Sequence, residues 1–211
     1  AEYIKVPANK LIELPSGLDV AIASLVEPLA VAVHGVDRAH VREADRVLII
    51  GAGPIGLAIG AVLRGRGIAY DITARYPHQQ QAAERLGGKL RADGHYDVVM
   101  DAIGSAASLK QSTTRVKPMG RIGLVGMFWE PTKLEQAFWA KEAVLIPAAG
   151  YYCKSPSRSF DEARTLLHQY PDIAQALITH RYPLEGVTEA FHTAGTRAAG
   201  AIKVVFDIGK R

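Results

Sequence analysis

Short apolar runs alternate with helix-like segments through the middle of the chain. The runs are rich in Val and Ile, as buried strands are, and turn residues separate them from the segments that follow. The expected strands are 46–50, 69–74, 96–104, 120–128 and 143–152, and the expected helices begin after residue 53 and then cover 77–86, 105–116 and 133–141. Alternation of this kind is typical of a parallel sheet with helices on both faces. The pattern therefore predicts an α/β fold with a doubly wound parallel sheet.

The two ends of the chain follow other patterns. Residues 1–15 alternate weakly between apolar and polar positions, which predicts one or two short strands. Asp19 is expected to cap a helix over 21–25, and a second helix is expected from Pro28 to about Arg38. The order after residue 159 is helix, strand, helix and strand, at 160–168, 177–184, 185–194 and 201–208. These segments mark where the regular alternation ends.

A glycine turn joins the first strand of the alternating region to its first helix. The stretch "RVLIIGAGPIGLA" places Gly51, Gly53 and Gly56 in the spacing GxGxxG, and Pro54 and Ile55 begin the helix. The first glycine permits a tight turn, the second lets a pyrophosphate approach the backbone, and the third lets the helix pack on its strand. Exposed N–H groups at the start of the helix would then meet the phosphates. The spacing also occurs by chance, but its place between a strand and a helix predicts a dinucleotide site.

The end of the second strand distinguishes NADP from NAD. Ala74 and Arg75 stand where NAD-binding proteins carry an acid for the ribose hydroxyls. A small residue leaves room for a 2′-phosphate, and a guanidinium can pair with it. Asp71 is the alternative, because it lies at about the expected distance from the glycines, unless it points to the far face of the strand. The residues favour NADP and leave NAD open.

Composition narrows the class of protein further. With 48% hydrophobic and 22% charged residues among 211, the chain is expected to be globular, and its net charge of +4 comes from scattered basic residues that do not predict nucleic-acid binding. The apolar run 21–36 is interrupted by Glu27, Pro28 and His34, so no insertion into a membrane is expected. Cys153 is the only cysteine, which excludes an intrachain disulfide and fits a reducing cytoplasm.

Several segments, in order, resemble the medium-chain, zinc-dependent alcohol dehydrogenases, including the sorbitol and threonine dehydrogenase branches. They are "AEYIKVPANKLIELPSGL", "EPLAVAVHGV", "VLIIGAGPIGLA", "YDVVMDAIG", "KPMGRIGLVG", "LITHRYPL" and "GAIKVVF". The resemblance implies a Rossmann sheet plus remnants of a GroES-like catalytic domain. It divides the chain into the tail of the catalytic domain (1–30), the Rossmann domain (31–152) and a return to the catalytic domain (153–211).

The resemblance also makes Glu27 of the "EPL" motif a ligand or near-ligand of a catalytic zinc. Nothing in the sequence matches the cysteine and the His-Glu pair that complete this site in the family, and one carboxylate cannot hold zinc. An acid in this position is also favoured by the dipole of a helix start. His34 and His180 are expected to be structural. We therefore expect zinc only in an intact enzyme, of which this chain is the C-terminal part.

Other contacts to the cofactor follow from the resemblance and from position in the sheet. The candidates are Ile103, Gly104, Val125, Gly126, Met127 and Lys203. Gly104 and Gly126 close two strands at their carboxyl ends, where ligands bind in such sheets. The resemblance places Ile103 near the adenosine and residues 125–127 near the nicotinamide. Lys203 either reaches the pyrophosphate or is a solvated lysine on an edge strand.

These features together predict an oxidoreductase that transfers a hydride between NADP(H) and an alcohol or carbonyl substrate, incomplete in this chain. Two alternatives stay open: a zinc-free NADP(H)-binding module or regulatory relic, and a structural or interaction protein. The resemblance also allows a homodimer or homotetramer through the strand at 143–152.

Overall fold

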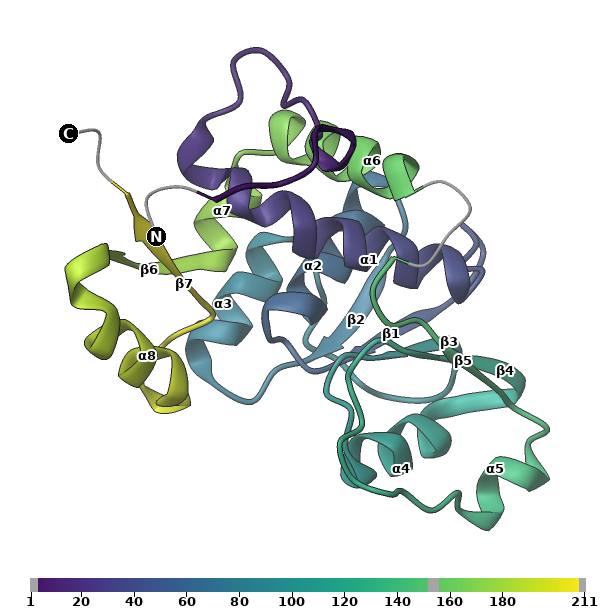
Figure 1. The fold of residues 1–211 in the computed structure, drawn as a ribbon. Helices are drawn as coiled ribbons and strands as arrows, with labels where there is room; N and C mark the ends of the chain where they lie inside the picture. The colour runs from purple at the N-terminus through teal and green to yellow at the C-terminus, as the bar shows by residue number, and fades with distance from the viewer. Residues whose placement is uncertain (1–3, 152–155, 209–211) are drawn as a thin grey trace.

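The computed structural model describes residues 4–151 and 156–208, and its centre is a five-stranded parallel sheet (Figure 1). The strands are β1 (Val47–Ile50), β2 (Tyr70–Thr73), β3 (Tyr96–Asp101), β4 (Val116–Leu124) and β5 (Val144–Pro147). Their order across the sheet is β2-β1-β3-β4-β5, and every neighbouring pair is parallel. The predicted parallel α/β fold is confirmed.

Helices cover both faces of this sheet, as Figure 1 shows. One face carries α1 (Val26–Arg38), α2 (Pro54–Gly65), α3 (Pro77–Arg85), α6 (Pro156–Gln169) and α7 (Asp172–Leu177), and the other carries α4 (Ala106–Arg115) and α5 (Gln136–Ala140). Successive side chains of a strand point to opposite faces, so Val47 and Ile49 enter the larger core while Leu48 and Ile50 enter the smaller one. This two-sided burial explains why β1 reads as an unbroken apolar run.

The connection between α3 and β3 is short. In the usual Rossmann order a further strand lies outside the second strand. Here the pairing outside β2 is a single bridge between Asp71 and Lys89, with Ile72 N–H donating to the Lys89 carbonyl and Lys89 N–H donating to the Tyr70 carbonyl. Residues 86–95 contain no helix. The half of the sheet next to β2 is therefore reduced to two strands and a bridge.

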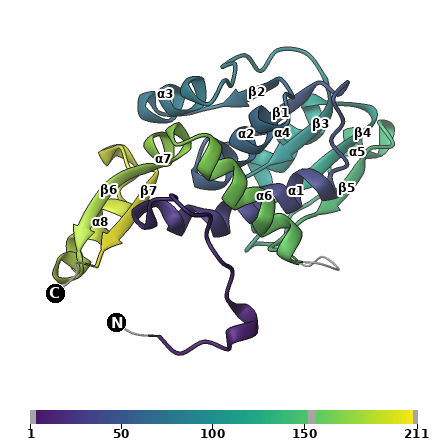
Figure 2. The same ribbon diagram turned by 90° about the horizontal axis from the view of Figure 1, so that it is seen from above.

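A second, two-stranded parallel sheet pairs β6 (Ile178–Pro183) with β7 (Lys203–Asp207). The connection contains α8 (Val187–Gly195) between two short 3-10 helices, Leu184–Gly186 and Arg197–Ala199. This unit lies beside the main sheet near α3 and α7 (Figures 1 and 2). Both strands and α8 were predicted, but α7 was not, because its six residues are too few to show a helical period.

The predicted strands at 1–15 are wrong for the residues that the structure describes. Residues 4–19 contain one 3-10 turn, Ala8–Lys10, and no strand, and Figure 2 shows the segment running away from the body of the molecule. Ile4 is 85% exposed and Leu11 is 66% exposed. Alternation alone does not hold a strand without a neighbouring sheet edge.

The start of α1 differs slightly from the prediction. Asp19 accepts a hydrogen bond from Ala21 N–H at 2.9 Å, as predicted, but the segment it caps, Val20–Leu25, is a 3-10 helix. The α-helix then begins at Val26, two residues before Pro28, because proline is tolerated in the first turn. The continuous stretch Val20–Arg38 is long and apolar enough to cross a membrane by length and composition, and more than half of it is buried in the fold. The absence of membrane insertion stays a prediction.

The bounds of several other elements also differ from the predicted ones. The helix predicted at 133–141 covers only Gln136–Ala140, and the strand predicted at 143–152 ends at Pro147, after which Ala148 N–H makes a last bond to β4, to the Leu124 carbonyl at 2.9 Å. The predicted domain boundary after residue 30 falls inside α1, and the boundary after residue 152 lies outside the described residues, as does Cys153. The domain division stays a prediction.

Lys141 ties α5 to the end of α4. Its ammonium donates to the carbonyl oxygens of Thr113, Thr114 and Val116, each at 2.8 Å, and burial lowers its pKa. We predict that Lys141→Met lowers the free energy of unfolding by roughly 1–3 kcal/mol, because the carbonyls of the buried residues Thr113 and Val116 lose their donor. Urea unfolding measures this difference. Lys110→Met on α4, where the side chain is 67% exposed, is the control and should change stability by less than about 0.5 kcal/mol.

Candidate nucleotide-binding site

The three glycines after β1 have the geometry that their spacing predicts. Gly51 has φ +98°, and a Cβ there would lie 2.5 Å from Ile103 Cγ1. A Cβ on Gly53 would meet nothing within 4 Å, so the space above this residue is open. A Cβ on Gly56 would lie 1.8 Å from the Gly51 carbonyl oxygen. The turn is therefore tight at its first and third glycines and accessible at its second.

The first turn of α2 presents free N–H groups next to this open space. Gly53 is the N-cap and has no side chain, Pro54 occupies the first turn, and Leu57 N–H makes the first helical bond, to the Gly53 carbonyl at 2.9 Å. No side chain caps this end among the described residues. An N-terminus of this kind binds anions through its N–H groups and its dipole. The turn fits the pyrophosphate of a dinucleotide.

The end of β2 lies beside the glycine turn. Ile50 pairs with Thr73, and Thr73 Oγ1 accepts a hydrogen bond from Gly51 N–H at 3.0 Å, so Ala74 and Arg75 follow directly at this edge. The Arg75 side chain is exposed, and its guanidinium lies 5.4 Å from the centre of the Tyr76 ring. In the described part of the chain no carboxylate pairs with it. This cation is available to an anionic ligand.

Asp71 is occupied elsewhere. Its carboxylate accepts a hydrogen bond from the Tyr96 hydroxyl at 2.7 Å and lies 3.5 Å from the Arg46 guanidinium. Burial, followed by the bond to Asp71, raises the pKa of Tyr96 to about 12, so the hydroxyl stays a donor at neutral pH. These contacts place Asp71 in a charged cluster and not at the glycine turn, which removes the main argument for NAD.

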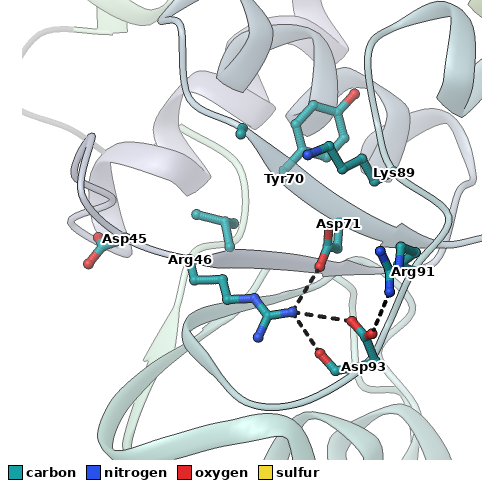
Figure 3. A pocket seen from close by; sticks show the side chains of 9 residues that line it. Asp45, Arg46, Tyr70, Asp71, Lys89, Arg91 and Asp93 are labelled. Carbon is teal, nitrogen blue, oxygen red and sulfur yellow. Dashed lines mark hydrogen bonds and ion pairs between the residues drawn. The ribbon is translucent and has the colours of Figure 1, made fainter.

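That cluster borders a cavity of about 370 Å³ (Figure 3). Its lining residues are Asp45, Arg46, Val47, Ala69, Tyr70, Asp71, Lys89, Arg91 and Asp93. Val47 and Tyr70 begin their strands, so the cavity lies at the amino ends of β1 and β2. Dinucleotides bind at the carboxyl ends of such sheets. Three acids balance three bases here, and the cavity therefore has neither the place nor the charge of the cofactor site.

The loops after β3 and β4 lie against each other. A Cβ on Gly104 would lie 2.5 Å from the Met127 carbonyl oxygen, and a Cβ on Gly126 would lie 2.3 Å from Gly104 N. Ile103 and Met127 are each 51% exposed, and Val125 packs against Gly35 of α1. These loops lie at the same edge of the sheet as the glycine turn. The structure thus brings together the predicted residues of four strand ends.

Two predicted residues are not joined to this group by any contact in the described part of the chain. Glu27 is exposed in the first turn of α1, and among the described residues no three His, Cys, Asp or Glu side chains come together as a metal site. Lys203 begins β7 in the second sheet, and its ammonium makes no hydrogen bond or ion pair with a described residue. The roles of Glu27 and Lys203 stay predictions.

The two histidines expected to be structural occupy different environments. His34 is 5% exposed on α1, and burial and the nearby Arg38 lower its pKa. His180 on β6 is half-buried, with Nδ1 3.0 Å from Thr179 Oγ1. Neither belongs to a metal cluster of described residues, and their structural roles stay predictions.

Sequence reasoning missed two residues of the site, Thr73 and Asp101. Thr73 holds the turn through Gly51 N–H, and Asp101 is fully buried and accepts hydrogen bonds from Ile103 and Gly104 N–H. A signal for Asp101 was present, because it is the one acid that ends the apolar stretch "VVMDAIG". Burying a carboxylate costs free energy unless it is hydrogen-bonded, so an acid in an apolar strand indicates that its side chain has a specific partner.

The sheet order, the glycine turn and the loops beside it define a Rossmann-type α/β domain. Residues 20–208 match the family model described as "Glucose dehydrogenase C-terminus". The chain belongs to this family, the C-terminal region of medium-chain, zinc-dependent alcohol dehydrogenases, and the resemblance inferred from the sequence is confirmed.

Individual relatives agree with this assignment. The chain is 29% identical to L-threonine 3-dehydrogenase of Saccharopolyspora erythraea over 98% of this chain and 64% of the relative. An Escherichia coli CFT073 alcohol dehydrogenase in complex with NADH superposes with TM-score 0.80 at 23% identity, over 94% of this chain and 63% of that one. A protein described as a zinc-binding dehydrogenase of Sinorhizobium meliloti, bound to NADP, gives TM-score 0.78 at 24% identity, over 96% and 64%. The chain spans less than two thirds of the length of each.

Proposed function

We propose that this chain is the nucleotide-binding and C-terminal part of an oxidoreductase that transfers a hydride between NADP(H) and an alcohol or carbonyl substrate. The observation that carries the proposal is the open space above Gly53 at the N-terminus of α2, together with Arg75, which follows the end of β2 beside the turn and pairs with no carboxylate among the described residues. Related dehydrogenases act on small hydroxylated molecules, as the name of the threonine enzyme indicates. A small-molecule substrate is therefore part of the proposal.

Each strand end has a separate task in this proposal. The α2 N-terminus binds the pyrophosphate, and Arg75 binds the 2′-phosphate in the room left by Ala74. Ile103 and Met127 supply apolar surface that excludes water from the two ends of the cofactor. The bound cofactor supplies the hydride chemistry, while the protein supplies position and charge. NADP is favoured over NAD because Asp71 is held away from the turn.

Zinc is proposed only for an intact enzyme. A catalytic zinc site needs three protein ligands and an open position, and Glu27 is a single candidate ligand with no partner among the described residues. No step of catalysis is therefore derived through zinc. The second candidate function, which the sequence leaves open, is an NADP(H)-binding module or regulatory relic without zinc.

The experiment that separates these functions uses the purified 211-residue chain. We predict that fluorescence titration gives tighter binding of NADPH than of NADH, by about tenfold or more, because charge-assisted bonds to the 2′-phosphate each contribute roughly 1.5–3 kcal/mol. We also predict that the chain oxidises no alcohol or polyol with added zinc. Zinc-dependent oxidation would refute the incomplete site, and equal binding of both nucleotides would refute the NADP assignment.

The assembly and location of the protein are further parts of the proposal. β5 is the edge of the main sheet, and Val144 on it is 50% exposed, so this strand is available for pairing in a homodimer or homotetramer. A cytoplasmic location is proposed with it, because the relatives are metabolic dehydrogenases. Neither nucleic acid nor a membrane is proposed as a partner.

A further inference from the structure

Asp101 at the end of β3 is connected to two loops of the candidate site, those after β3 and β4. Its carboxylate Oδ1 accepts hydrogen bonds from Ile103 N–H at 2.9 Å and Gly104 N–H at 3.0 Å. Its backbone carbonyl accepts bonds from Val125 N–H and Gly126 N–H, both at 2.9 Å. One residue therefore holds the loop after β3 with its side chain and the loop after β4 with its backbone.

The position of the β3 loop controls the space at the glycine turn. Ile103 Cγ1 lies 2.5 Å from where a Cβ of Gly51 would be, so a shift of Ile103 changes the surface next to the turn. Gly104 has φ +76° and touches Gly126 and Met127 in the β4 loop. A change in the loop that Asp101 holds would thus reach both the turn and the β4 loop.

Burial of the Asp101 carboxylate lowers the stability of the fold. The residue is 0% exposed, and its Oδ2 is buried without a hydrogen-bond partner in the part of the chain that the structure describes. A buried polar atom that lacks a partner costs stability, and such groups concentrate at functional sites. Stability alone therefore does not explain an acid at this position.

We infer that Asp101 is a positioning residue for the dinucleotide, which fixes the loops after β3 and β4 against the glycine turn. The inference rests on the proposed NADP(H)-binding function. It predicts that the hydrogen-bond acceptor matters and that the charge does not. Asp101→Asn keeps an oxygen for the two N–H groups, whereas Asp101→Leu has a similar volume and no acceptor.

The test measures NADPH affinity and thermal midpoint for the whole chain and its variants. We expect Asp101→Leu to bind NADPH about 10- to 100-fold more weakly, because the two hydrogen bonds that hold the β3 loop are lost. Asp101→Asn should stay within about threefold of the unmodified chain. Asp97 is the matched control: it is on the same strand, and its Oδ2 accepts from Arg46 N–H at 2.9 Å, at the opposite end from the site. Asp97→Leu should lower the thermal midpoint without changing affinity.

Four results decide the inference. Unchanged affinity in Asp101→Leu overturns it, and so does an equal loss in Asp101→Asn, because then the acceptor is not what matters. If Asp101→Leu does not fold, amide exchange in the unmodified chain decides: slow exchange at Ile103 and Gly104 N–H supports the inference, and fast exchange overturns it. If the unmodified chain binds no dinucleotide, the proposed function itself fails, and this inference fails with it.

Discussion

Replacing Gly56 with alanine is expected to abolish dinucleotide binding and to destabilise the fold. A methyl group at this position would lie 1.8 Å from the Gly51 carbonyl oxygen and 3.4 Å from Ala102 Cβ. The close atom belongs to the backbone of the turn, so it cannot rotate away as a side chain would. The start of α2 must therefore move away from β1, which displaces the N–H groups that would bind the pyrophosphate.

The expected magnitudes follow from that displacement. Overpacking of a tight contact costs about 1–3 kcal/mol, and a backbone contact is at the upper end of this range. NADPH affinity should fall by more than about 100-fold, because the anion site depends on the position of several N–H groups at once. Differential scanning calorimetry measures the first effect and fluorescence titration measures the second.

Two other glycines of the chain are matched controls for this substitution. The methyl group of Gly53→Ala meets nothing within 4 Å, so this variant should leave the thermal midpoint unchanged. The methyl group occupies the space where a pyrophosphate would approach, so this variant separates an effect on binding from an effect on stability. Gly195→Ala at the end of α8 also meets nothing, and it should change neither quantity. If Gly56→Ala kept both the stability and the affinity of the unmodified chain, the tight turn would not be the basis of the site.

Much of the main sheet could be predicted because its strands are buried on both faces. A strand such as Val47–Ile50 has no polar position, so it is recognisable without knowledge of its neighbours. The same burial fixed the place of the glycine turn, because the chain must reverse directly after the strand. The residues at 51–56, 74–75, 103–104 and 125–127 could then be assigned to one edge from the rule that parallel strands end together.

What could not be predicted depends on contacts between distant parts of the chain. The reduction of the outer strand to the Asp71–Lys89 bridge is not visible in the pattern, because a missing element leaves no signal. The role of Asp71 was ambiguous because its partner, Tyr96, lies 25 residues away in sequence. The weak alternation of residues 1–15 predicted strands that do not form, since no described strand pairs with residues 4–15.

Exposed apolar side chains at the second sheet support the view that this chain is part of a larger protein. Phe191 is 71% exposed and Ile208 is 57% exposed, and neither edge of the β6–β7 sheet pairs with another described strand. Sheet edges and apolar patches of this kind are normally covered. The candidate cofactor site lies at the main sheet, so nucleotide binding and the covering of these edges can be tested separately.

Arg75→Asp is expected to reverse the preference between the two nucleotides. The guanidinium of Arg75 follows the end of β2 and pairs with no carboxylate among the described residues, so it is free to bind a 2′-phosphate. Aspartate removes this attraction and adds repulsion. We expect NADPH affinity to fall by about 100-fold, from the loss of one or two charge-assisted bonds, and NADH affinity to change by less than about threefold.

The control for this reversal is Arg85→Asp, which makes the same change of charge at the far end of α3, where Arg85 contacts Gln175 at 3.4 Å. If long-range charge were the cause, Arg85→Asp would weaken NADPH binding as well, and the effect of both variants would fade at high salt. If Arg75→Asp weakened NADH as much as NADPH, Arg75 would act on a part that the two nucleotides share, and the 2′-phosphate assignment would be wrong. A loss of affinity that is confined to NADPH and to the Arg75 variant would show that the end of β2 binds the 2′-phosphate, because the two nucleotides differ only in this group.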